Sequence, residues 1–174
     1  MVNNQTIDII IPNFNKAKYV KQCLDSIISQ TYKNWKIYFI DDNSNDETKE
    51  VLKDFENIDN IKIIYLKENK GPSYCRNLGI EQSSSEYLAF MDSDDFWPEN
   101  KLESQIKAMV KNDYNFTYTD YFFFFNNNQK KLKKTCLPNF YDYKIFLNHS
   151  SMSTSSIIIK KDLIKKIFFK NVEH

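Results

Sequence analysis

Glycine is scarce in this chain, which contains only Gly71 and Gly79 among 174 residues. Dinucleotide-binding Rossmann fingerprints and phosphate-cradling P-loops both need clustered glycines, because the backbone must approach the phosphates closely. Neither motif can be built here. Any bound nucleotide must therefore be held by side chains, by a metal ion or by isolated backbone amides.

Cysteine and long apolar runs are limited as well. Cys23, Cys75 and Cys136 are odd in number and far apart, and no CxxC pair occurs. This pattern argues against a disulfide framework and a zinc site, and it suits a reducing compartment. No apolar run approaches the roughly 20 residues needed to span a bilayer, and the polar residues 1–6 do not resemble a signal peptide. We therefore expect a cytoplasmic protein.

The charge of the chain is nearly balanced, with a net value of +1. This balance provides no electrostatic basis for binding nucleic acid. Lysines gather within residues 130–134 and 160–166. Such clusters are usually solvated faces, but they can also contact phosphate groups or an anionic membrane surface. Peripheral association with the inner face of the membrane therefore stays open as an alternative.

Apolar runs and amphipathic segments alternate along the first two thirds of the chain. Strands are predicted at 7–11, 35–40, 61–66 and 87–91, and helices at 18–30, 46–55, 72–82 and 98–111. The first helix carries an apolar stripe of i, i+4, i+8 spacing, and Pro72 suits the first position of the third. Asn13 or Asn15 is predicted to cap the first helix, and Ser44 or Asn45 the second. The alternation predicts a mainly parallel sheet covered by helices on both faces.

The second half of the chain is less regular. Strands at 115–125 and 131–137 are predicted to form a hairpin around a turn at 126–128. A short helix at 141–147, a strand at 155–159 and a helix at 161–168 are expected to follow. No internal repeat or linker divides the chain, so residues 1–174 are expected to form one domain.

Carboxylates follow two of the predicted strands. Asp92, Asp94 and Asp95 come directly after the strand at 87–91, and Asp41 and Asp42 come after the second strand. A solvated turn that caps the next helix would explain the first group alone. However, the carboxyl ends of parallel strands share one edge of the sheet, where ligands bind in open α/β proteins. Clustered carboxylates also repel one another unless a cation, such as a hard divalent metal ion, lies among them. The two groups together favour a ligand site.

Five short motifs occur in order along the chain. They are Ile9–Asn15 (IIIPNFN), Ser29–Tyr32 (SQTY), Asp41–Ser44 (DDNS), Gly71–Ile80 (GPSYCRNLGI) and Asp92–Asp95 (DSDD). Together they resemble family 2 glycosyltransferases with the GT-A fold, closely over residues 7–112 and more weakly through residues 154–157. The resemblance implies a Rossmann-like, three-layer α/β/α sandwich. Its nucleotide-sugar-binding half would span about 7–112, and a partial acceptor-side half about 113–174.

This resemblance also implies an activity. Such enzymes move a sugar from a nucleotide diphosphate donor to an acceptor with inversion at the anomeric carbon, using Mn²⁺ or Mg²⁺. The cation stabilises the negative charge that the departing nucleoside diphosphate accumulates. We expect a UDP-sugar donor, a saccharide or lipid-linked acceptor, and a role in the biosynthesis of lipopolysaccharide, capsule or a related bacterial glycan. The sequence does not predict the sugar, the linkage or the oligomeric state.

The motifs assign candidate residues to the nucleotide. By resemblance, Pro12, Phe14 and Asn15 shape the floor of its pocket, and Phe14 can stack on the base. Asp41 and Asp42 would accept hydrogen bonds from the base imide and the ribose hydroxyls. The local alternatives are that both aspartates cap a helix and that Phe14 belongs to the core.

Other candidates concern the diphosphate and the metal. Gly71 and Arg76 would approach the nucleotide, and Arg76 offers donors suited to phosphate or base edges; the alternative for Arg76 is a surface ion pair. Asp92 and Asp94 match an Asp-x-Asp motif. Asp94 is the expected direct metal ligand, with Asp92 as the second, and Asp92 and Ser93 also belong to the nucleotide-sugar set.

The residue that removes the acceptor's hydroxyl proton has no clear candidate. In similar enzymes a carboxylate in a Glu-Asp motif does this, shortly after a segment like residues 168–174, where this sequence ends. Glu173 lies at the terminus, which is a poor place to hold a base rigidly, and Asp120 lies within an aromatic strand. Two hypotheses follow: an active, metal-dependent inverting glycosyltransferase, or a truncated or inactive homologue that binds the nucleotide sugar without a catalytic base.

Overall fold

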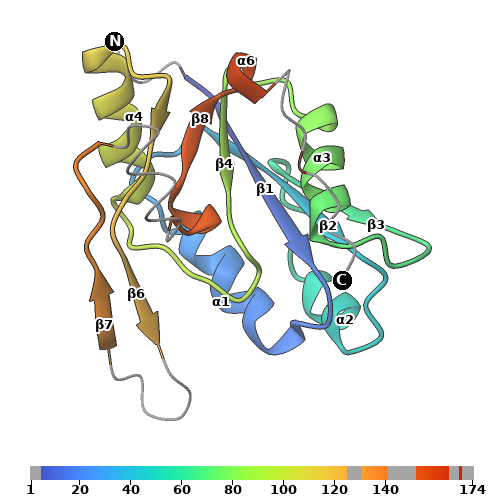
Figure 1. Ribbon diagram of the computed structural model, residues 1–174. Coiled ribbons are helices and arrows are strands. Elements are labelled where there is room, and N and C mark those ends of the chain that lie inside the picture. The colour runs from blue at the N-terminus through green and yellow to red at the C-terminus, as the bar shows by residue number, and fades with distance from the viewer. Residues whose placement is uncertain (1–4, 125–130, 141–151, 165–168, 170–174) are drawn as a thin grey trace.

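The computed structural model describes residues 5–124, 131–140, 152–164 and 169. These residues form a six-stranded sheet with the order β3-β2-β1-β4-β8-β5 and a separate two-stranded sheet, β6-β7 (Figure 1). The strands are β1 (Ile7–Asn13), β2 (Trp35–Asp41), β3 (Ile61–Tyr65), β4 (Tyr87–Phe90), β5 (Phe116–Thr117), β6 (Tyr121–Phe124), β7 (Lys131–Thr135) and β8 (Ile158–Lys160). The helices are α1 (Ala17–Ile28), α2 (Thr48–Leu52), α3 (Pro72–Gln82), α4 (Lys101–Asn112) and α6 (Lys161–Ile164), with a 3₁₀ turn, η2, at Thr154–Ser156.

The first four strands of the large sheet run parallel. β1 pairs with β2 and β4, and β2 pairs with β3. The register places Asn13 of β1 beside Asp41 of β2 at the carboxyl edge. β8 is antiparallel to both of its neighbours, β4 and β5. The prediction of a mainly parallel sheet is therefore confirmed.

Helices cover both faces of this sheet. Ile9 and Ile11 of β1 belong to a buried cluster that includes the apolar faces of α1, α2 and α4. Ile10 faces the other way, into a cluster with Cys75 of α3 and Ile164 of α6. This alternation along β1 is what a strand buried on both sides produces. The predicted three-layer α/β/α arrangement is confirmed.

The second half differs from its prediction in several elements. The expected strand at 115–125 is broken, because β5 joins β8 in the large sheet while β6 pairs with β7 in a hairpin that extends away from it (Figure 1). The expected strand at 155–159 begins as the 3₁₀ turn η2 and becomes extended only at β8. The helix predicted at 98–111 begins at Lys101. The turn at 126–128, the helix at 141–147 and the end of the helix at 161–168 lie outside the described residues.

The predicted helix caps are wrong for α1 and α2. Their N-caps are Lys16 and Glu47, and neither side chain forms a capping hydrogen bond. Instead the Asp46 carboxylate accepts the backbone N–H of Ala17 at 2.9 Å and that of Thr48 at 3.0 Å, so it serves the start of both helices. Although burial raises the pKa of Asp46, these hydrogen bonds outweigh it and lower the pKa overall. The loops after β1 and β2 are thereby held together.

Lys101 is a buried lysine at the start of α4. Its Nζ lies 3.8 Å from the centroid of the Trp97 ring and has no hydrogen-bond partner among the residues that the structure describes. Burial lowers the pKa of Lys101 well below its ordinary range. The unfolded chain therefore binds a proton that the folded chain releases, and stability should rise with pH from neutrality toward the ordinary lysine pKa.

We expect Lys101→Met to raise the free energy of unfolding at pH 7 by about 1 kcal/mol, since it removes a buried donor without a partner among the described residues and, with it, the cost of releasing the Lys101 proton on folding. The gain should shrink as the pH rises toward 10, because Lys101 then folds without losing a proton. Urea denaturation at pH 7 and pH 9.5 measures both effects. Lys107→Met, on the exposed face of the same helix, serves as the control. A destabilised variant, or a gain that grows with pH, would contradict the expectation.

Candidate functional site

An open cleft of about 410 Å³ lies at the carboxyl ends of β1, β2 and β4. Its walls come from the loops after these strands and from the first turn of α3. The lining residues are Pro12, Asn13, Phe14, Lys16, Asp42, Asn69, Gly71, Pro72, Cys75, Arg76, Asp92, Ser93 and Asp94. The structure thus brings together the residues that were predicted to bind the nucleotide sugar and the metal ion, with two exceptions, Asn15 and Asp41.

Asp41 is fully buried behind the wall of the cleft. Its carboxylate accepts hydrogen bonds from Asn13 Nδ2 at 2.9 Å, from Ser44 N at 3.2 Å and from Ser44 Oγ at 2.5 Å. The bond to Asn13 leaves Asn13 Oδ1 as a buried acceptor without a partner in the described part of the chain. Asp41 therefore orients the asparagine that lines the cleft and does not line the cleft itself.

Asp42 does line the cleft, and it also fixes the loop before α3. Its two carboxylate oxygens accept the backbone N–H groups of Lys70 at 2.7 Å and Gly71 at 2.8 Å. Gly71 has a φ of 84°, a conformation that favours glycine over residues with a side chain. The same loop then starts α3 with Pro72. Asp42 thus determines where the first turn of α3 meets the cleft.

Asn15 lies in the loop beneath Phe14 and has a φ of 54°. Its Oδ1 accepts the backbone N–H of Asn45 at 2.9 Å, and its own N–H donates to Ser44 Oγ. This residue therefore shapes the loop without contributing to the lining. Phe14, in contrast, is 44% exposed and presents its ring to the cleft, so it does not belong to the core.

The acidic turn after β4 carries two ion pairs. Arg76 Nη2 of α3 lies 2.6 Å from Asp92 Oδ1, and Lys16 Nζ, at the start of α1, lies 2.7 Å from Asp94 Oδ2. The hydrogen bond to Asp94 raises the pKa of Lys16. Each carboxylate that was expected to bind metal is therefore matched by a cation from another element.

Arg76 is held more firmly than Lys16. Only 13% of its side chain is exposed, and its guanidinium carbon lies 5.4 Å from the centroid of the Phe169 ring. Asn77, the next residue of α3, exchanges two hydrogen bonds with the backbone of Phe169. Arg76 Nε is buried without a partner among the described residues. Arg76 thus forms an ion pair, as the alternative expected, but this pair lies in the wall of the cleft and not on an open surface.

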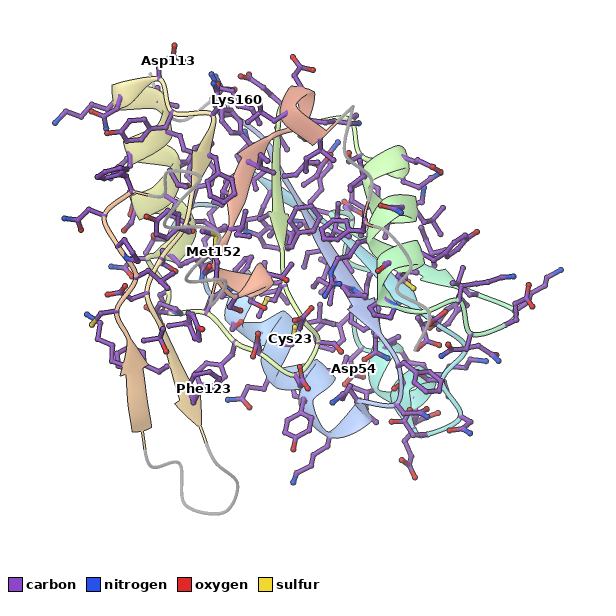
Figure 2. The ribbon with its side chains drawn as sticks, viewed as in Figure 1. Cys23, Asp54, Asp113, Phe123, Met152 and Lys160 are labelled. Atoms are coloured by element: carbon purple, nitrogen blue, oxygen red, sulfur yellow. The ribbon has the colours of Figure 1, made fainter. Side chains whose placement is uncertain are left out.

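Asp95 belongs to the same turn but faces away from the cleft. Its carboxylate accepts a hydrogen bond from Ser155 Oγ, which in turn accepts the backbone N–H of Asp92 at 3.0 Å. Burial raises the pKa of Asp95. The carbonyl oxygen of Ser155 accepts Trp97 Nε1 at 2.8 Å. The 3₁₀ turn η2 therefore supports the acidic turn through Ser155. Cys23 of α1 also lies beside this turn (Figure 2), with Sγ 3.9 Å from the carbonyl oxygen of Asp92.

The cleft fits a divalent cation that a ligand would help to hold. The described residues contain no group of three or more His, Cys, Asp or Glu side chains arranged around one point. Magnesium-type sites, however, commonly use only one or two carboxylates and complete their coordination with substrate phosphates and water. Asp92 and Asp94 supply two such carboxylates on the lining, and they would hold the ion.

Asp120 and Glu173 were the two remaining candidates for the base. Asp120 accepts the backbone N–H of Leu137 at 2.9 Å and pairs with Lys134 at 2.9 Å. These contacts lower its pKa. Asp120 stabilises the base of the β6–β7 hairpin and does not line the cleft. Glu173 lies outside the described residues.

Five lining residues were not among the sequence candidates: Asn13, Lys16, Asn69, Pro72 and Cys75. Asn13 stands within the first motif and Lys16 directly after it, so position alone could have indicated both. Asn69 Nδ2 donates to the carbonyl oxygen of Asp42 at 3.3 Å, and burial raises the pKa of Cys75 to about 12. Pro72 and Cys75 stand within the fourth motif, whereas nothing in the local sequence distinguishes Asn69 from an ordinary loop residue.

The same fold occurs in solved glycosyltransferases. Staphylococcus aureus TarS 1–349, in complex with UDP, superimposes with a TM-score of 0.76 at 22% identity, over 95% of this chain and 50% of that chain. The mannosyltransferase PcManGT of Pyrobaculum calidifontis, in complex with GDP-Man and Mn²⁺, gives a TM-score of 0.69 at 16% identity, over 92% of this chain and 46% of the other. These similarities show the GT-A α/β fold.

Residues 8–168 match the profile of glycosyl transferase family 2, and the chain belongs to this family. An uncharacterized glycosyltransferase of Haemophilus influenzae is 32% identical over 174 residues, which cover 99% of this chain and 69% of that protein. The Escherichia coli UDP-Glc:alpha-D-GlcNAc-diphosphoundecaprenol beta-1,3-glucosyltransferase WfgD is 30% identical over 168 residues, which cover 97% of this chain and 65% of WfgD. The chain thus spans about two thirds of the length of these relatives.

Proposed function

We propose that this protein binds a UDP-sugar together with Mn²⁺ or Mg²⁺ and transfers the sugar, with inversion, to a saccharide or lipid-linked acceptor of a bacterial surface polysaccharide. The observation that carries the proposal is the cleft, in which Asp92 and Asp94 face Arg76 and Lys16 at the carboxyl edge of the sheet. The UDP complex of TarS and the UDP-glucose donor in the name of WfgD support uridine as the base.

The base and ribose would lie between the loops after β1 and β2. Phe14 offers an exposed ring for stacking on the base. Asn13 Oδ1, which has no partner among the residues that the structure describes, suits the imide N–H of uracil. Asp42, at the edge of the cleft, would accept hydrogen bonds from the ribose hydroxyls, and Asp41 would act on the base through Asn13. Residues 7–112 would therefore form the donor-binding half and residues 113–174 the acceptor side.

The diphosphate would lie over the first turn of α3 and the acidic turn. Arg76 Nε is a buried donor with no partner in the described part of the chain, and guanidinium groups match the geometry of phosphate oxygens. Asp92 and Asp94 would hold the cation, with Ser93 between them against the donor. When bound, the cation supplies the positive charge that stabilises the departing UDP.

No carboxylate in the described lining of the cleft is available to take the acceptor's proton. Among the described residues, the carboxylates that line the cleft are Asp42, Asp92 and Asp94. Asp42 already accepts two loop amides, and the other two would hold the cation. An alternative is therefore a homologue that binds the nucleotide sugar without transferring it.

We place the protein in the cytoplasm, with peripheral association at the inner face of the membrane as the way to reach a lipid-linked acceptor. Lysines in the β6–β7 region and near α6 support contact with an anionic surface. Among the described residues, no helix is long and apolar enough to cross the bilayer.

Calorimetric titration with UDP and GDP, in Mn²⁺ and in EDTA, tests the donor site. We expect UDP to bind in Mn²⁺ more tightly than GDP, and binding to be lost in EDTA, because the diphosphate then lacks the cation that would link it to Asp92 and Asp94. Equal or reversed preference would contradict the uridine assignment, and no metal-dependent binding of either would contradict the proposed function. Release of free sugar or its transfer from a UDP-sugar separates the enzyme from the alternative that only binds.

A further inference from the structure

The ion pair between Lys16 and Asp94 differs from the other ion pair of the cleft. Lys16 and Asp94 are 42% and 39% exposed, and their side chains come from elements far apart in the sequence. Lys16 occupies the N-cap position of α1, where its side chain makes no capping bond. Exposed pairs of this kind contribute little to stability. The contribution of this pair to stability therefore does not explain its place in the cleft.

The three carboxylates that line the described part of the cleft have partners within the protein. Asp92 is paired with Arg76, Asp42 accepts two loop amides, and Asp94 is paired with Lys16. A divalent cation that arrives alone must displace Lys16 from Asp94. A cation that arrives with a diphosphate does not leave Lys16 unpaired, because a phosphate oxygen can replace the carboxylate as its partner.

Lys16 is also the cation of the cleft that can move. Arg76 is mostly buried, with Phe169 against its guanidinium group. Lys16 has an exposed, flexible stem and one hydrogen-bond partner for its Nζ among the contacts described, Asp94. An exchange of partners would therefore cost Lys16 little, whereas Arg76 would have to leave a packed position.

We infer that Lys16 is a diphosphate-binding residue that occupies Asp94 until the metal ion and the nucleotide bind together. This role rests on the proposed function. This exchange makes the binding of the two ligands interdependent. When the diphosphate binds Lys16, Asp94 becomes available to the metal ion, and when the metal ion binds Asp94, Lys16 becomes available to the diphosphate. Since coupling between two ligands is reciprocal, each should raise the affinity for the other by the same factor.

The variant Lys16→Met separates the two halves of this exchange. Without nucleotide, we expect its Mn²⁺ affinity to rise about fivefold, the upper range of what a half-exposed ion pair contributes. In saturating Mn²⁺, we expect its UDP affinity to fall by about tenfold, because a charged hydrogen bond to phosphate is lost. The factor by which UDP raises Mn²⁺ affinity should therefore shrink. The electron paramagnetic resonance signal of free Mn²⁺ and calorimetry with UDP provide these affinities.

Two further variants serve as controls. Lys21→Met removes an exposed ion pair with Asp25 on the same helix, outside the lining, and should change neither affinity. Adding Asp94→Asn to Lys16→Met should abolish the gain in Mn²⁺ affinity. Thermal unfolding of each variant checks that it is folded.

Unchanged or weaker Mn²⁺ binding by Lys16→Met would overturn the inference, and so would unchanged UDP affinity. The measurement with Mn²⁺ alone does not depend on the nucleotide. If the wild-type protein fails to bind UDP while Lys16→Met still binds Mn²⁺ more tightly, the proposed function fails and the competition at Asp94 stands.

Discussion

Asp94→Asn is expected to lower the affinity for UDP in Mn²⁺ by about 100-fold, since even residues that only orient a metal ligand typically contribute 10–100-fold to metal affinity. Asparagine keeps the size of the side chain but removes the charge that would hold the cation over the diphosphate. It also releases Lys16, which then lacks its partner. Calorimetry should show that the variant in Mn²⁺ binds UDP no better than the wild-type protein does in EDTA.

A matched control exists at the opposite end of the molecule. Asp113 also pairs with a lysine, Lys160, at 2.9 Å, and Figure 2 shows this pair far from the acidic turn beside Cys23. Asp113 has a φ of 53°, which asparagine tolerates well. Asp113→Asn should therefore leave UDP binding unchanged. Metal-dependent UDP binding of wild-type strength in Asp94→Asn would remove Asp94 from the metal site.

Gly79→Ala is expected to lower the free energy of unfolding by about 3 kcal/mol, the upper end of the usual cost of overpacking. A Cβ at this position would lie 2.4 Å from Ile10 Cγ2 and 3.0 Å from Ile10 Cγ1. Ile10 is fully buried at the centre of the sheet, and its branched side chain has few alternative rotamers. α3 would have to move away from β1. Urea denaturation measures the loss.

Two further variants test whether the contact with Ile10 causes the loss of stability in Gly79→Ala. Gly71→Ala, at the start of the same helix, meets no atom within 4 Å but keeps a φ of 84°, so we expect only the ~1 kcal/mol cost of a left-handed conformation. Ile10→Ala creates space at the contact, so its combination with Gly79→Ala should cost less than the sum of the two single changes. Additive losses would show that the contact with Ile10 is not responsible.

The fold of residues 7–112 could be predicted from the sequence because its signals are local. The apolar runs that became β1 to β4, and the stripe on α1, lie within single elements, and β–α alternation then determines a parallel sheet. The acidic turn was placed at the carboxyl edge for the same reason. Gly79 was recognised as part of a motif, but its contact with Ile10 depends on how closely α3 approaches β1.

The features that were missed depend on residues distant in sequence. Asp46 caps α1 from another loop, and Lys16 pairs with a carboxylate 78 positions away. A lysine at the start of a helix is usually solvated, so no local pattern could have indicated its partner. Asp41 and Asp42 are adjacent in the sequence and both are buried, but only the pleat of β2 and the position of Asn13 decide which of them lines the cleft.

The aromatic run in the second half gave an incomplete prediction for a similar reason. Residues 115–125 have the composition of one long strand, yet β5 and β6 belong to different sheets. Pairing of β5 with β8 decides where the run breaks, and β8 lies about forty residues further along the chain. A two-residue strand such as β5 has no signal of its own.

The place of β8 between β4 and β5 has a consequence for the chain as it leaves the ribosome. β4 can pair with β1, which already lies beside β2, as soon as residue 90 has emerged, but β4 then forms a border of the sheet until residues 158–160 follow. During that interval β4 has no strand on the side opposite β1, and unpaired borders of this kind promote association between chains. The nascent protein is thus most prone to aggregate after residue 90 and before residue 160 has emerged, when the core formed by β1 to β4 is already in place.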